Sequence, residues 1–274
     1  MNRKFACWIL FSTFALFFAC ARQEQQNQHD NKDDFTFYLT NDRSAIIIER
    51  YMGQQTLVVI PSVIEDMPVV KIGQRAFFGV GSETRLAGLS IPDTVIVIER
   101  EAFSHNRLES VAFGSNLTVI GAAAFAHNLL TELKIPESVI AIDVTAFMEN
   151  NLESVSIPGS VAFIGVGAFM QNQLTEVSLA YGVAHIGNAA FAHNRLQCIT
   201  IPGSVARIES FAFENNPLAQ ISIGSGVELG SYSVMGHRLP SFDRDFDEFY
   251  FAHGRRAGIY TYSDGAWSVE FFRE

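Results

Sequence analysis

"IPGSVAFIGVGAFMQNQLTEVSLA", residues 157–180, decides the fold, because a close copy, "IPGSVARIESFAFENNPLAQISIG", follows at residues 201–224. Ile, Val, Phe, Asn and Leu keep their places in the two copies, while most of the residues between them change. The copies start two 22-residue periods apart, and further copies precede them in the chain. A repeat of this length predicts a solenoid, in which each repeat forms one coil and successive coils stack.

Apolar residues form columns when the repeats are aligned. Counted from Ile91, they occupy the first, fifth, eighth, thirteenth, eighteenth and twenty-first places of nearly every repeat. The thirteenth place is always Phe, at Phe103, Phe125, Phe147, Phe169, Phe191 and Phe213. Stacked coils would bury these columns as one continuous core, and a chain of 274 residues that is 48% hydrophobic is large enough to build it. The regular spacing favours a core role for the Phe column over a ligand-stacking platform.

One polar column is equally regular, because an asparagine recurs once per repeat, at Asn106, Asn128, Asn150, Asn172, Asn194 and Asn216. A primary amide both donates and accepts hydrogen bonds. This asparagine ladder is therefore expected to satisfy backbone groups in the turns that would otherwise stay unpaired.

The combined pattern A-F-x-x-N-x-L-x-x-V-x-I-P-x-S-V-x-x-I-G resembles the BspA-like leucine-rich repeats of bacterial surface proteins, most closely over residues 86–227. Residues 45–78 are similar to the irregular first coil of that family. The resemblance implies an α/β or mainly β right-handed solenoid with short parallel strands and 22-residue coils. It also implies a concave strand surface that binds protein, and attachment to host matrix proteins or to other bacteria.

The ends of the chain depart from the repeat. We expect a signal peptide over 1–19, a polar tether over 20–34, an irregular first coil over 35–85, repeats over 86–229 and a cap over 230–274. "GVGSETRLAG", residues 79–88, is expected to bulge as a loop, and Gly230 stands where the repeat has Ile. Ser241 is a candidate N-cap for a helix carrying Phe242, Phe246, Phe249 and Tyr250 and ended by Gly254. Residues 257–272 predict a hairpin turned at Asp264-Gly265.

The first residues predict export. Arg3 and Lys4 precede an apolar stretch from Phe5 to Ala19 that is short for a membrane span. Two processing sites compete: a lipobox-like site that leaves a lipid on Cys20, and an A-x-A site that removes Cys20 by cleavage after Ala21. We favour lipidation, because an unpaired Cys at the end of such a stretch is otherwise a poor choice in an oxidising compartment. The lipid would be the only attachment to a membrane.

The outward-facing strand positions are the candidate binding surface, because they vary within a fixed scaffold. In the L-x-x-V-x-I segment these are the second, third and fifth places. The candidates are Glu109, Ser110, Thr131, Glu132, Lys134, Glu153, Ser156, Thr175, Glu176, Ser178, Gln197 and Thr200. Small polar residues also keep an exposed sheet soluble, and the face lacks the Trp, Tyr and Arg residues that dominate tight interfaces.

Other functions are disfavoured. The net charge of −10 becomes −12 once Arg3 and Lys4 are removed, which argues against a nucleic-acid partner. His105, His127 and His193 share one turn column with Glu149, Gln171 and Asn215, which favours a polar turn over a metal site, so we expect no metal and no cofactor. Known catalytic motifs are missing, so we expect a protein-binding surface protein rather than an enzyme. A spacer lipoprotein without a specific ligand is the alternative, and a surface hydrolase comes third.

Overall fold

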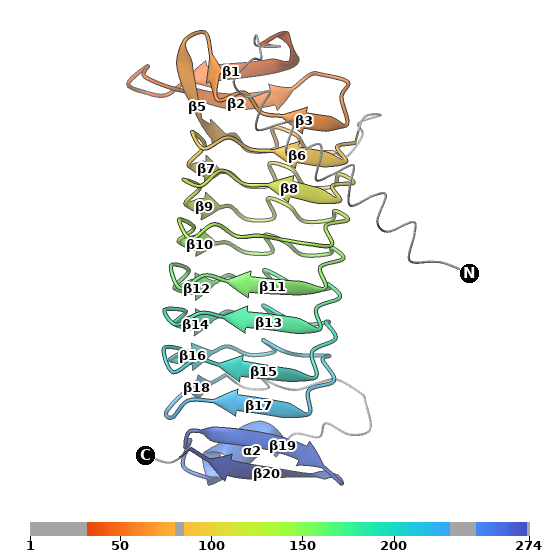
Figure 1. Cartoon of the computed structure of the whole chain (residues 1–274), viewed down its shortest axis with the longest axis vertical. Coiled ribbons are helices and arrows are strands. Elements are labelled where there is room, and N and C mark those ends of the chain that lie inside the picture. The colour runs from red at the N-terminus through yellow and green to blue at the C-terminus, as the bar shows by residue number, and fades with distance from the viewer. Residues whose placement is uncertain (1–31, 80–84, 231–244, 273–274) are drawn as a thin grey trace, which may run out of the picture.

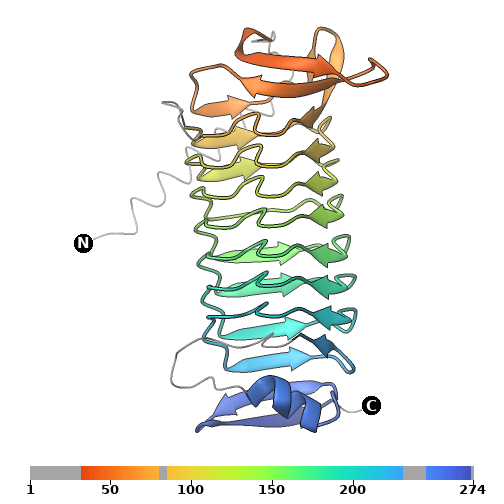
Figure 2. The same cartoon turned by 180° about the vertical axis from the view of Figure 1, so that it is seen from behind.

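The computed structural model describes residues 32–79, 85–230 and 245–272, and these form a single column of stacked coils (Figure 1). Most coils contribute one strand to the long sheet on one side of the column and another strand to a short sheet on another side, as the view from behind also shows (Figure 2). The predicted parallel β-solenoid with 22-residue coils is confirmed, because paired residues in neighbouring strands lie 22 positions apart, as in Ile142 with Ile164.

The long sheet runs down one side of the column and has eleven strands. It begins with β1 (Phe35–Leu39), β2 (Ile46–Tyr51), β4 (Val63–Ile64), β5 (Met67–Ile72) and β7 (Val97–Ile98). It continues with β9 (Val119–Ile120), β10 (Ala141–Ile142), β12 (Phe163–Ile164), β14 (His185–Ile186), β16 (Arg207–Ile208) and β18 (Glu228–Leu229). From β5 to β18 every neighbouring pair of strands is parallel. At the N-terminal end, β1 pairs antiparallel with β2, and β4 pairs antiparallel with β5.

The strands on the other side form three separate short sheets. The first is β3 (Leu57–Val59), β6 (Gly88–Ser90) and β8 (Ser110–Ala112), and the second is β11 (Ser154–Ile157) and β13 (Glu176–Leu179). The third is β15 (Cys198–Ile201), β17 (Gln220–Ile223), β19 (Gly258–Ser263) and β20 (Ala266–Phe271). The coil between the first two sheets has only an isolated bridge, Lys134 to Ser156, where the repeat predicts a strand.

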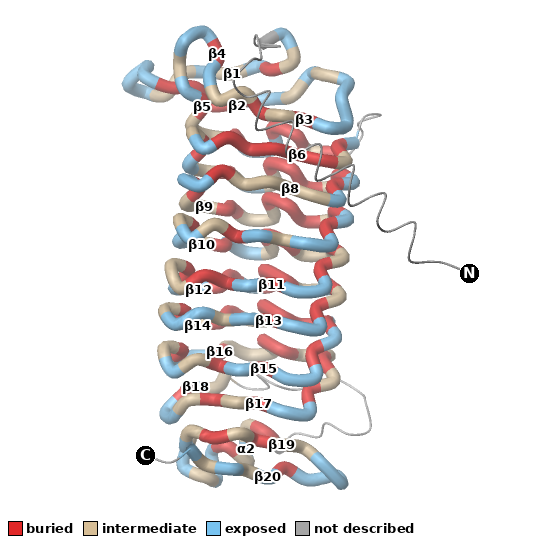
Figure 3. Tube along the Cα trace, in the orientation of Figure 1, coloured by how far each residue is buried: buried red, intermediate tan, exposed pale blue. Residues whose placement is uncertain are grey.

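Buried residues recur at the same places in successive coils (Figure 3). The rings of the Phe column stack 5.2–5.5 Å apart from Phe103 to Phe213, with interplanar angles of 5–17°. Phe77 and Tyr51 extend the stack toward the N-terminus, with centroids 4.8 and 5.2 Å from the next ring. Both lie 26 residues before their neighbour, so a fixed 22-residue period does not find them.

Two expectations about the ends of the repeats need correction. Leu229 pairs with Ile208, so Leu229 and not Gly230 occupies the Ile place, and the last coil is one residue shorter. Gly230 takes the place of the glycines that follow Ile in other coils, since a Cβ there would lie 2.6 Å from the Ser210 nitrogen. The expected loop over 79–88 lies partly outside the described residues, and within it Leu86 is already buried and Gly88 already begins β6.

The C-terminal helix and hairpin are present as predicted. Helix α2 (Asp245–Ala252) ends before Gly254, whose φ is +70°, and β19 and β20 turn through Asp264 and Gly265 with φ values of 53° and 81°. The proposed cap Ser241 and Phe242 lie outside the described residues. The short 3-10 helix η1 (Lys32–Asp34) opens the described chain.

Aromatic side chains join this cap to the last coil. Strand β19 pairs antiparallel with β17, so it covers the edge of the third short sheet. Tyr250 is fully buried, and its hydroxyl donates to the carbonyl of Gly224 at 2.8 Å and accepts from the nitrogen of Val227 at 3.3 Å. Its ring lies 5.5 Å from that of Tyr260, which is also fully buried.

We expect the cap to lose stability at alkaline pH because of Tyr260. Burial raises the pKa of its phenol to about 12. An unfolded tyrosine ionises near pH 10, so the stabilisation is complete below that value and is lost as the pH rises toward 12. Trp267 is the only tryptophan after residue 8 and packs in the cap, so its fluorescence reports cap unfolding. The midpoint of cap unfolding should decrease as the pH is raised from 10 to 12. The decrease should be less steep for the Tyr260→Phe variant. Equal slopes for the two proteins would contradict this assignment.

Candidate functional site

The strand face is the set of outward-facing positions on β8, β11, β13 and β15, on the residue that precedes each of these strands, and on the segment 131–134 of the coil between β8 and β11. Parallel pairing sets these residues in rows, with Ser154 opposite Glu176 and Ser156 opposite Ser178. The Thr175 hydroxyl donates to the carbonyl of Glu153 at 3.2 Å, which links neighbouring coils at the start of β13.

Eleven of the twelve predicted face residues are exposed: Glu109, Thr131, Glu132, Lys134, Glu153, Ser156, Thr175, Glu176, Ser178, Gln197 and Thr200. Ser110 is the exception, because it is half-buried and its Oγ is inaccessible to solvent. That hydroxyl has no hydrogen-bond partner among the described residues. The Ser110 hydroxyl is therefore not available to a partner, and the usable face begins at Glu109 and extends toward the C-terminus.

The chemistry of the strand face is acidic and hydrophilic. Glu109, Glu132, Glu153 and Glu176 are all exposed, and Lys134 is the only cation among the predicted face residues. The remaining side chains are small hydroxyls and an amide, which adapt to many hydrogen-bonding partners. Cys198 is an exposed free thiol on β15 of the same face.

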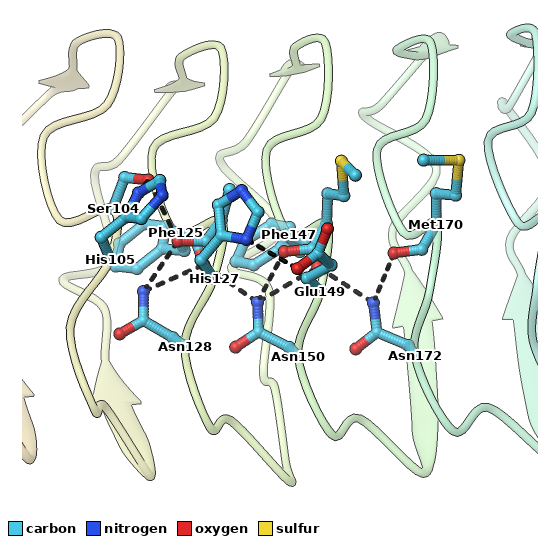
Figure 4. Close-up of polar contacts among 12 residues, drawn as sticks. Ser104, His105, Phe125, His127, Asn128, Phe147, Glu149, Asn150, Met170 and Asn172 are labelled. Carbon is cyan, nitrogen blue, oxygen red and sulfur yellow. Dashed lines mark hydrogen bonds and ion pairs between the residues drawn. The ribbon is translucent and has the colours of Figure 1, made fainter.

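Below the face, the asparagine ladder fixes the position of each strand. Asn150 accepts from the Leu130 nitrogen at 3.1 Å and donates to the carbonyls of Phe125 at 2.9 Å and Phe147 at 3.2 Å. Its neighbours Asn128 and Asn172 make the equivalent bonds one coil away (Figure 4). All six ladder residues are 4–6% exposed. Each amide thus joins the turn of its own coil to the preceding coil, which holds the coils in register.

The turn residue before each ladder asparagine has a left-handed backbone, which the sequence did not reveal. His105, His127, Glu149, Gln171, His193 and Asn215 have φ values between 53° and 61°. A second left-handed column lies four residues earlier and includes Glu101, Ala123, Thr145 and Gly167. Two such residues per coil turn the chain sharply on either side of the Ala-Phe pair. The polar character of the first column is the signal, because Asn and other polar residues tolerate this conformation better than branched ones.

Histidines in this column contact one another but do not assemble a metal site. The rings of His105 and His127 lie 4.2 Å apart, and His127 Nδ1 lies 2.8 Å from Glu149 Oε2 (Figure 4). Burial, and then the neighbouring His127, lower the pKa of His105. Among residues 32–79, 85–230 and 245–272, no group of three or more His, Cys, Asp or Glu side chains could hold a metal ion.

A serine ladder is another feature that sequence reasoning missed. Ser138, Ser160 and Ser204 each donate from Oγ to a carbonyl of the preceding coil, at 2.6, 2.6 and 2.8 Å. These serines belong to the repeated I-P-x-S-V pattern, so their recurrence was the available signal. They fix the corner between the strand face and the long sheet.

The described part of the chain contains no helix that is both long and apolar enough to cross a membrane. Its one α-helix, α2, has eight residues, and it lies in the C-terminal cap.

Comparison with solved structures places the fold among bacterial leucine-rich repeat proteins. A leucine-rich cell surface protein from Faecalibacterium prausnitzii is 28% identical, with a TM-score of 0.62 over 88% of this chain. The chain spans only 60% of that protein's length. The leucine-rich repeat protein of T. pallidum is also 28% identical, covers 61% of this chain and 89% of its own, and has a TM-score of 0.47.

A family-wide sequence comparison gives the assignment. The profile of the BspA type leucine-rich repeat region matches six copies, over residues 56–174 and 141–243. No curated protein matches the chain. The matched residues make up more than half of the sequence and contain the phenylalanine column and the asparagine ladder. The chain therefore belongs to the family of proteins with BspA type leucine-rich repeat regions.

Proposed function

We propose that this chain is an exported, surface-attached protein that binds another protein through its strand face. The observation that carries the proposal is the uniform exposure of eleven polar side chains on a scaffold held in register by the asparagine ladder. Membership of a leucine-rich repeat family supports protein binding, and the cell surface description of the F. prausnitzii protein supports the location.

The charge of the face indicates the kind of partner. Four exposed glutamates against one lysine favour a partner surface that carries Lys or Arg side chains. Host matrix proteins or the surface of another bacterium are the partners we propose. Export would depend on the leader over residues 1–19, and attachment on a lipid at Cys20.

A spacer lipoprotein without a specific ligand remains the second candidate function. It is favoured by one observation, which is that exposed Trp, Tyr and Arg residues are missing from the eleven accessible face positions. A surface hydrolase has less support, because leucine-rich repeat solenoids are typically not enzymes.

Charge reversal on the strand face tests the proposal. We expect residues 22–274 to bind saturably to at least one protein of a panel of host matrix and plasma proteins. The quadruple variant Glu109→Lys, Glu132→Lys, Glu153→Lys and Glu176→Lys should lose at least about tenfold in affinity, because the charges that steer and orient the partner are inverted. Surface plasmon resonance measures the affinity, and circular dichroism verifies folding.

A matched control changes the same charge elsewhere. Glu49, Glu65, Glu137 and Glu248 are exposed and lie outside the strand face, so their replacement by Lys should leave binding within about twofold. Equal loss in both variants would show a nonspecific charge effect and contradict the site. Undiminished binding in the face variant would move the site elsewhere, and no saturable binding by the wild type would favour the spacer function.

A further inference from the structure

The outer face of the long sheet has a chemistry opposite to that of the strand face. Ile96, Ile140 and Phe163 are 44, 58 and 42% exposed, although they are large and apolar. They lie on or beside strands β7, β10 and β12 of that sheet. We call this surface the apolar patch. It is defined by the outward residues of four consecutive coils: Ile96, Val97, Val119, Ile140, Ala141 and Phe163.

The patch contains no charged group at its outward strand positions, 96–97, 118–119, 140–141 and 162–163. Thr118 is the one residue at these positions with a polar side chain. Its hydroxyl donates a hydrogen bond to the carbonyl of Ile96 at 3.0 Å, so this donor is already satisfied within the protein. Val144 and Val166, 40 and 38% exposed, follow β10 and β12, and the exposed Asp143 beside Val144 marks the edge of the patch there. Exposed apolar residues that gather on one face and are rimmed by polar residues mark an interaction site.

Charged groups lie at both ends of the patch and differ in sign. At the N-terminal end, ion pairs within the chain join three cations to two acids: Lys71 to Glu99, and Arg75 and Arg100 to Glu101. At the C-terminal end, two acids pair with one histidine and one arginine: Glu209 with His185, and Glu228 with Arg207. Among the groups of these ion pairs, with histidine neutral, the N-terminal end has one more cation than acids and the C-terminal end one more acid than cations.

We propose that the apolar patch is the interface of a homodimer in which two copies pack antiparallel, face to face. The long sheet is ordered β5-β7-β9-β10-β12-β14, so a twofold axis between β9 and β10 places β7 over β12 and β5 over β14. Val97 then meets the larger Phe163, and Val119 meets the smaller Ala141. A closed twofold contact uses the same patch on both copies and leaves no open apolar surface.

The same twofold axis pairs the opposite charges. Lys71 on β5 is brought toward β14, where the carboxylate of Glu209 lies 2.9 Å from His185 Nε2. Packing the copies in parallel would instead place like ends together. This complementarity favours a second copy of the chain over an unrelated apolar partner.

The size of the patch indicates a weak, reversible dimer. Four coils spaced about 4.8 Å apart extend on the order of 15–20 Å along the column. At about 3.3 Å per residue, two to five outward residues per coil span roughly 7–17 Å along the strand, so the patch covers at most a few hundred Å². This area is smaller than the standard interface of about 800 Å² per partner. The strand face lies on a different side of the column, so a dimer leaves it free on both copies (Figures 1 and 2). Two free faces would raise the avidity for a repetitive or surface-bound partner.

Sedimentation equilibrium of residues 22–274 tests the dimer without any ligand, so its outcome is separate from that of the binding proposal. The wild type should show a reversible monomer–dimer equilibrium. The double variant Ile140→Glu with Phe163→Glu should be monomeric over the same concentrations, with an unchanged circular dichroism spectrum and melting temperature. The matched control Met52→Glu with Tyr181→Glu alters exposed apolar residues outside the patch, 55 and 81% exposed, and should dimerise like the wild type.

A charge swap tests the antiparallel arrangement. Lys71→Glu and Glu209→Lys should each raise the dimer dissociation constant at least about fivefold, and the two changes together should restore it within about twofold. Only the restored affinity distinguishes the twofold contact from a general charge effect. A wild type that stays monomeric up to about 100 μM, or a dimer that survives the Ile140→Glu, Phe163→Glu change, overturns the proposal. A double charge variant that stays weakened overturns the antiparallel geometry.

Discussion

Asn150→Ala is expected to lower the free energy of unfolding by about 2–4 kcal/mol, because it removes one rung of the asparagine ladder. The amide of Asn150 accepts from the Leu130 nitrogen at 3.1 Å and donates to the Phe125 carbonyl at 2.9 Å. Ala cannot replace either bond, and the buried Leu130 nitrogen is left without its acceptor. Urea unfolding followed by far-ultraviolet circular dichroism measures the loss.

The next residue supplies the control for this prediction. Asn151 is half-buried and its backbone nitrogen bonds to the Leu130 carbonyl at 2.9 Å, a contact that Ala preserves. Asn151→Ala should therefore change stability by at most about 0.5 kcal/mol. Similar losses at the two positions would show that the ladder bonds do not set the stability of the coils.

Phe147→Ala is expected to cost about 3–5 kcal/mol, because it leaves a cavity in the middle of the aromatic stack. The Phe147 ring lies 5.4 Å from those of Phe125 and Phe169, and it is fully buried. The neighbouring rings have little freedom to fill the space, since backbone bonds such as Phe147 N to Ala168 O, at 2.8 Å, fix the coil spacing. The same urea experiment measures the effect.

An exposed aromatic residue provides the control, which distinguishes the effect of a buried cavity from the effect of losing any aromatic ring. Tyr181 is 81% exposed, so Tyr181→Ala should stay within about 0.5 kcal/mol of the wild type. A loss below about 1 kcal/mol for Phe147→Ala would mean that the stack relaxes into the gap, and would contradict a rigidly spaced core.

The repeat in the sequence was sufficient to predict the coils and the buried columns, and the local pattern around Asp264-Gly265 predicted the C-terminal hairpin. A fixed period identifies equivalent positions only where no residue is inserted or deleted. For this reason it missed Phe77 and Tyr51, each 26 residues before its stacking partner, and it placed Gly230 where Leu229 pairs. Local chain length, and not residue type, caused both errors.

Side-chain exposure was harder to predict than the position in the repeat. Ser110 shares the alternation of the other face residues, yet its hydroxyl is buried. The long-sheet strands have only two residues each in most coils, which is too short for an alternation to separate inward from outward positions. The exposed Ile140 and Phe163 therefore could not be recognised before the fold was known.

The left-handed turns escaped prediction for a different reason. His127 and Glu149 have φ values of 57° and 53°, and of the two only His is a residue type that is enriched in this conformation. Their column shows only a preference for polar residues, which any solvent-facing turn would also show. The sequence predicts that the asparagine ladder bonds to backbone groups in the turns, but the carbonyls that it reaches, Phe125 for Asn128 and Phe147 for Asn150, become visible only in three dimensions.

Cys198 offers the most direct test of the claim that the strand face binds the partner. It is exposed on β15, and it is the only cysteine in residues 22–274. The measurement is the affinity for a ligand found in the protein panel, before and after complete modification of Cys198 with a bulky polyethylene-glycol maleimide. A control variant that combines Cys198→Ser with Glu248→Cys carries the same group on the cap helix instead. We predict a loss of at least about tenfold when Cys198 of the wild type is modified, and less than about twofold when the control variant is modified. Unchanged affinity of the protein modified at Cys198 would contradict the account.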